Sequence, residues 1–174
     1  MADPTLSAAL KEAYACAPAD VVVLHTLEFL HASFTTPLRV VRDHTSLTAT
    51  LEASAPANPG AVVTFVPYAF DFKLPSAGES SVPEIDITID NVGADLIPYF
   101  DGAANSATPV TMIYRPYLST DLSAPHMNPP LQMYLRAISA DMFRITAKAG
   151  FGDLGSRRFP ALMYTAQTFP GLAA

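Results

Sequence analysis

The segment EIDITIDNV, at residues 84–92, indicates the fold most clearly. Apolar and polar side chains alternate along it, with Ile85, Ile87 and Ile89 between Asp86, Thr88 and Asp90. Successive side chains of a β-strand point to opposite faces, so this pattern places the isoleucines in a core and the polar residues outside. The segment therefore predicts a β-strand with one buried face.

Similar β-rich segments lie on both sides of this strand. Several combine β-branched or aromatic residues with partial alternation, and turn residues separate them. They are residues 20–30, 38–42, 46–53, 62–74, 110–118, 131–139 and 142–151. Pro67 implies an edge, a bulge or a break within its segment, because proline cannot donate to a ladder. With 16 prolines against 8 glycines, the pattern predicts a mainly β, antiparallel sandwich or barrel.

The two ends of the chain differ from this β-rich body. Residues 1–18 predict a short helix, with Asp3 as its cap, Pro4 at its first position and Pro18 beyond its end. Residues 156–174 are apolar but carry Pro160 and Pro170, which keep them from joining a sheet interior. The 174 residues are predicted to form a single domain.

Composition excludes several classes of protein. Half of the residues are hydrophobic and 15% are charged, which is too apolar for disorder. The single cysteine, Cys16, cannot form an intramolecular disulfide. The N-terminus lacks the pattern of a signal peptide, and no apolar run is long enough to span a bilayer. We therefore expect a soluble protein made in the cytoplasm, without membrane insertion.

The distribution of charge suggests two interpretations. A net charge of −6 argues against a dedicated nucleic-acid binder. Acidic residues dominate residues 1–130, whereas residues 131–174 carry five basic residues against Asp141 and Asp153. Such a split suits head-to-tail contact between identical subunits. It is equally compatible with two regions that face each other within one chain.

No constellation of residues predicts catalysis or a bound cofactor. The four histidines, His25, His31, His44 and His126, include no helical zinc-binding pair, and no nucleophile motif occurs. His44 follows Asp43 in what reads as a turn. Asp86 and Asp90 share one face, where they would either bind calcium or, more simply, be solvated or contact a partner. The chain is therefore predicted not to be an enzyme, and to hold no metal.

Several stretches resemble a phage and prophage family catalogued as a domain of unknown function, short proteins encoded among tail genes. They are residues 21–44, the sequence around FDFKLP at 70–75, and residues 84–92, 145–160 and 164–172. The resemblance implies a minor tail or tail-tip component of a long-tailed bacteriophage, similar in role to distal tail proteins. It also implies a tail-tube-like fold that forms a hexameric ring and contacts the tail-tube protein and tail-tip hub proteins in the virion.

Two groups of residues are candidates for this role. Asp86 and Asp90 are predicted to line a channel, where like charge keeps passing DNA from sticking. The segment 156–174 is predicted to cover a neighbouring subunit, although folding back onto its own domain stays open. Its predicted inter-subunit contacts are Arg157, Arg158, Phe159, Tyr164 and Phe169.

Three other functions also stay open. The first is an enzyme that acts on the host envelope. The second is a tip module that binds a receptor or a glycan. The third is an assembly factor that is absent from the finished virion.

Overall fold

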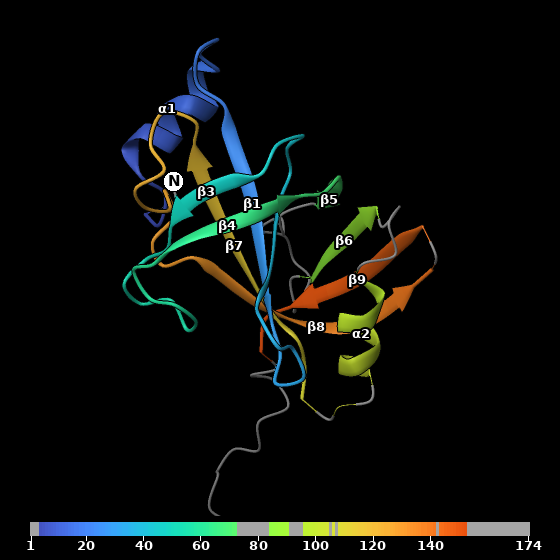
Figure 1. Ribbon diagram of the computed structural model, residues 1–174. Helices are drawn as coiled ribbons and strands as arrows, with labels where there is room; N and C mark the ends of the chain where they lie inside the picture. Colours follow the sequence, from blue (N-terminus) through green and yellow to red (C-terminus); the bar gives the residue numbers. More distant parts are fainter. Residues whose placement is uncertain are drawn as a thin grey trace, which may run out of the picture.

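The computed structural model describes residues 4–72, 84–90, 96–104, 106, 108–141 and 143–152 (Figure 1). The helices are α1 (Ala8–Cys16) and α2 (Ile97–Ala104). The strands are β1 (Val23–Leu30), β2 (Leu38–Val41), β3 (Leu47–Thr50), β4 (Val62–Pro67), β5 (Phe70–Phe72), β6 (Glu84–Asp90), β7 (Thr111–Leu118), β8 (Leu131–Ala140) and β9 (Arg144–Gly150). The mainly β fold with a short N-terminal helix is confirmed.

These strands form one sheet in the order β3-β4-β2-β1-β7-β8-β9-β6-β5. The neighbours are antiparallel, apart from the parallel pair of β2 and β4. β5 begins three residues after β4 ends, a distance of about 10 Å at most. The sheet must therefore curve until its two ends approach one another, although it does not close into a barrel.

Pro67 marks the point where the chain crosses between these two ends. β4 ends at Pro67, as predicted for a residue that cannot extend a ladder. The next residue, Tyr68, donates its N–H to the carbonyl of Val41 in β2 at 3.0 Å. The carbonyl of Ala69 then accepts from Asp90 N–H in β6 at 2.9 Å. Two residues thus join both halves of the curved sheet.

The main core fills the concave side of the sheet. Ile85, Ile87 and Ile89 are 1–2% exposed there, which confirms the predicted alternation of β6. α2 covers this core with Phe100, whose ring lies 5.8 Å from that of Phe29. α2 starts at Ile97 and continues through Pro98. A proline is tolerated there because first-turn N–H groups need no helical acceptor.

A second core lies on the other side of β1 and β7, where β3 and β4 cross in front of them (Figure 1). Residues 112–118 of β7 are consequently all buried, on both faces of the strand. Large side chains such as Phe65 of β4 and Tyr117 of β7 fill this layer, and both are 0% exposed. The central strands are therefore covered on both sides.

α1 packs on the end of β7 through Leu10, Ala13 and Leu118. Its cap differs from the prediction. Ser7 is the cap, because its Oγ accepts from Leu10 N–H at 3.1 Å, so Pro4 precedes the helix. Serine and aspartate cap equally well, so the local sequence did not choose between Asp3 and Ser7. Asp3 lies outside the described residues.

Candidate functional site

The outer face of β6 and β9 carries both predicted channel-lining residues. Asp86 lies opposite Lys148 and Asp90 opposite Arg144 in the antiparallel register. The carboxylate of Asp86 is 3.8 Å from Lys148 Nζ, and that of Asp90 is 3.6 Å from Arg144 Nε. All four side chains are about half exposed or more. The structure thus brings the two aspartates to one solvent-facing surface, each beside a cation.

Two further ion pairs extend this surface. Glu84 lies 3.7 Å from Arg136 of β8, and Asp71 of β5 lies 3.7 Å from Arg42. We call these four pairs on the outer side of the sheet the charged face. Exposed pairs of this kind contribute about 0–1 kcal/mol each, so they add little to stability. They affect mainly the electrostatic potential of this surface. Each acidic group has a basic neighbour, so the charged face presents alternating charge.

β8 has a strand edge that no other strand among the described residues occupies. It pairs with β7 only through Leu131–Tyr134, and Leu135 N–H still donates to the Val110 carbonyl at 2.8 Å. Beyond that point β8 continues to Ala140 and pairs only with β9 on its other side. A strand edge without a partner presents backbone donors and acceptors to an incoming chain. We call residues 136–140 the open edge.

A groove of about 870 Å³ adjoins the open edge. Its apolar lining includes Val110, Leu135, Ile138 and Phe151. Gly152, the last described residue, also lines it. The predicted inter-subunit contacts Arg157, Arg158, Phe159, Tyr164 and Phe169 lie outside the described residues.

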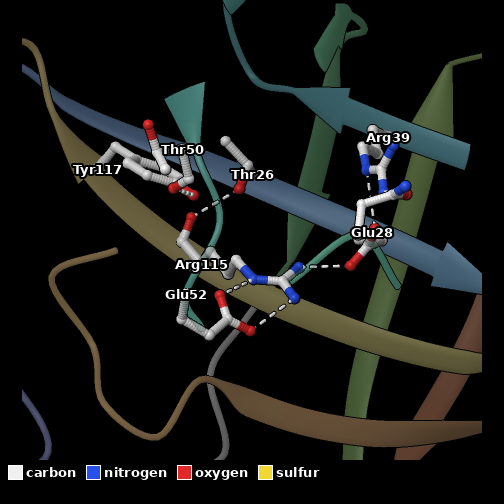
Figure 2. A network of polar contacts seen from close by, with 8 residues as sticks. Thr26, Glu28, Arg39, Thr50, Glu52, Arg115 and Tyr117 are labelled. Carbon is white, nitrogen blue, oxygen red and sulfur yellow. Dashed lines mark hydrogen bonds and ion pairs between the residues drawn. The ribbon is translucent and has the colours of Figure 1, made fainter. Parts of the chain in front are cut away.

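The structure contains a buried ion network that the sequence analysis did not predict, beside the second core (Figure 2). The guanidinium of Arg115 binds both carboxylate oxygens of Glu52, at 2.7 and 2.8 Å. Its Nη1 also donates to Glu28 Oε2 at 2.7 Å. The other oxygen of Glu28 accepts from Arg39 Nε at 2.8 Å. Two cations and two anions therefore form one balanced cluster, in which Glu28 and Arg115 are 0% exposed.

Backbone contacts hold this network in place. Thr26 Oγ1 donates to the carbonyl of Arg115 at 2.8 Å, and Tyr117 donates its hydroxyl to the Thr50 carbonyl at 2.9 Å. Burial alone would lower the pKa of Arg115, but its bonds to Glu52 and the charge of Glu28 outweigh this and raise it. The guanidinium thus stays charged, and the cluster fastens the segment after β3 onto β1 and β7. Its role is structural.

The pair Asp43 and His44 forms a turn in the structure. The Asp43 carboxylate accepts from the backbone N–H of His44 and from the hydroxyl of Thr45, instead of orienting the imidazole. Among the described residues, no three His, Cys, Asp or Glu side chains gather as a metal site. Within the same residues, neither helix has the length and apolar character needed to cross a membrane.

The comparison with curated proteins gives no match. A family model with the description "Domain of unknown function (DUF1833)" matches residues 9–164. This match covers both cores, the charged face and the open edge of β8. The chain therefore belongs to this family.

Proposed function

We propose that the chain is a structural subunit of a long bacteriophage tail, which forms a ring at the distal end of the tail. In this role it assembles with copies of itself, joins the tail-tube protein to tail-tip hub proteins, and performs no chemistry. The resemblance of its sequence to proteins encoded among tail genes supports the setting. The observation that carries the assembly is the open edge of β8 beside an apolar groove.

The contact between neighbouring copies uses this edge. The segment 156–174 of one copy lies in the groove of the next, where Phe159, Tyr164 and Phe169 are buried. Burying each large side chain contributes roughly 1.5–3 kcal/mol. Pro160 and Pro170 lack the N–H needed for strand pairing, so residues 161–169 between them add to the edge. Such a contact joins two different surfaces, and contacts of this type generate rings when the rotation closes.

Charge supports the same arrangement. Arg157 and Arg158 precede the apolar part of the segment and reach acidic residues at the rim of the charged face, such as Glu84. The charged face itself, with Asp86 and Asp90, lines the channel. Its cations Arg144 and Lys148 each lie beside an aspartate. They therefore form no uncompensated basic row that would retain the phosphates of passing DNA.

Deletion of residues 161–174 tests this assembly. The truncated chain should keep its β-sheet circular dichroism and cooperative unfolding but remain a monomer by light scattering. Electron microscopy should show rings only for the full chain. A matched control replaces Thr48, an exposed residue on β3 at the far end of the strand order, with alanine and should still form rings. Global unfolding of the truncated chain, or rings formed without the segment, would reject the inter-subunit contact.

A further inference from the structure

A second cavity lies away from the open edge, between α1, β1, β7 and the end of β5. Its volume is about 470 Å³, within the range of small-molecule sites. Leu10 of α1, Phe72 of β5, Met127 and Leu131 form an apolar wall. The rings of Phe72 and Tyr114 lie 5.0 Å apart, so part of the wall is aromatic. A ligand with an apolar, planar ring fits against such a wall.

Polar groups gather on the other side of this cavity. The hydroxyl of Tyr114 lies 2.8 Å from His25 Nδ1, and Tyr14 lines the same cavity. Burial, and then the charge of Arg42, lower the pKa of His25, so its ring is neutral at pH 7. Burial raises the pKa of Tyr114, which therefore keeps its proton. Either tautomer of the neutral His25 ring satisfies this pair, and the one that leaves a donor for a ligand accepts from Tyr114 at Nδ1.

This hydrogen bond leaves a donor for a ligand. With Nδ1 as the acceptor, the proton of the neutral imidazole lies on Nε2. The described part of the chain offers Nε2 no protein partner, although His25 lines the cavity. A half-buried N–H without a protein acceptor is satisfied only by water or by a ligand. The cavity thus contains an apolar wall and a donor opposite it.

Arg42 determines which ligand charge this cavity prefers. It is the only charged side chain among the described residues that line the cavity. Its guanidinium lies 3.7 Å from Asp71, but the two side chains are 50% and 70% exposed, so water screens this pair strongly. Arg42 N–H also donates to the His25 carbonyl at 3.0 Å, which keeps the two residues adjacent. A negative group at this rim gains a charge-assisted bond.

We propose that this cavity binds a small aromatic anion. The ring of the ligand lies against Phe72, Met127 and Leu131, and its carboxylate or sulfonate accepts from His25 Nε2 and Arg42. This site is independent of the assembly contact at β8. It gives the subunit a ligand site beyond its proposed structural role.

Binding of 8-anilinonaphthalene-1-sulfonate to the full chain tests the proposal, with methyl-labelled methionine as a site-specific probe. We expect saturable binding at one site and a shift of the Met127 methyl signal. Met133 is 0% exposed in the main core and should not shift. Arg42→Gln should weaken binding roughly tenfold or more, because a bond to a charged group is lost. Lys148→Gln, on the charged face and outside the lining of both the cavity and the groove, serves as the control and should bind as the unaltered chain does.

Two results would overturn this site. One is probe fluorescence without any shift of Met127, which would place the probe elsewhere, for example at the assembly groove. The other is an unchanged affinity in Arg42→Gln. A further variant, His25→Phe, keeps an aromatic ring but removes Nε2, and it should also weaken binding. Equal affinity in His25→Phe would likewise reject the assigned donor.

Discussion

Glu28 and Arg115 lie side by side beside the second core, with Oε2 of the glutamate 2.7 Å from Nη1 of the arginine and neither side chain exposed. They come from adjacent antiparallel strands, yet 87 residues separate them in sequence. Each charge is costly to bury alone and tolerable only with its partner. Arg115 also binds Glu52, so the arginine ties the segment after β3 to the centre of the sheet.

Replacing one member of this pair should destabilise the fold strongly. In Glu28→Ala, Arg115 loses one of its two carboxylate partners and Arg39 loses its own. Breaking a buried pair in this way costs about 3–5 kcal/mol of unfolding free energy. Urea unfolding followed by circular dichroism measures this loss. Asp86→Asn breaks an exposed pair on the charged face and should cost less than about 1 kcal/mol. Equal losses in the two variants would contradict the structural role of the network.

The stability of the fold should fall as pH decreases from 7.5 to 5.5. Burial lowers the pKa of His25 in the folded chain below its ordinary value of 6.5. Between these two pKa values the unfolded chain binds more protons than the folded chain, so acid favours unfolding. His25→Phe should reduce this loss of thermal stability, whereas His44→Gln, at an exposed turn, should keep it. A pH profile that His25→Phe leaves unchanged would reject a neutral His25 in the cavity.

Purified infectious particles should contain this chain. A ring subunit remains in the finished tail, so quantitative mass spectrometry should detect its peptides in a fixed ratio to the tail-tube protein. The ratio should persist through repeated density-gradient purification. If its peptides were lost completely from particles that remain infectious, the chain would be an assembly factor instead.

The alternation of apolar and polar side chains along the sequence predicted much of the fold. Alternation located β6 and its buried isoleucines, because the two faces of that strand meet core and solvent. The break at Pro67 followed from its missing N–H. The predicted start of α1 was wrong because two residues that can cap a helix, Asp3 and Ser7, precede it. Each of these outcomes depends on the residues of one short segment.

Contacts between distant strands explain what the sequence could not predict. The pairing of Asp86 with Lys148 depends on the register of β6 against β9. The burial of Glu28 and Arg115 depends on the second layer, which β3 and β4 provide. One signal was available in retrospect: each residue is a lone charge in the middle of an apolar strand, and the two charges are opposite.

Cross-linking should identify whether a subunit itself or its neighbour supplies the C-terminal segment in the groove beside β8. In a Cys16→Ser background, Ala137→Cys places an exposed thiol on the open edge, and Tyr164→Cys places one in the C-terminal segment. A disulfide forms only when the two Cβ atoms approach to about 4 Å. Mixing the two single variants under mild oxidation should therefore give a covalent dimer, resolved by non-reducing electrophoresis.

The control mixture combines Tyr164→Cys with Thr48→Cys on β3, and it should remain monomeric on the gel. When Ala137→Cys and Tyr164→Cys are combined in one chain, the neighbour's segment should still take the groove, so the product should be a ladder of linked copies. A fast-migrating monomer with an internal disulfide, together with no dimer in the mixture, would assign the segment to its own subunit. The charge split along the sequence would then reflect contact within one chain, and the open edge of β8 would no longer support a ring.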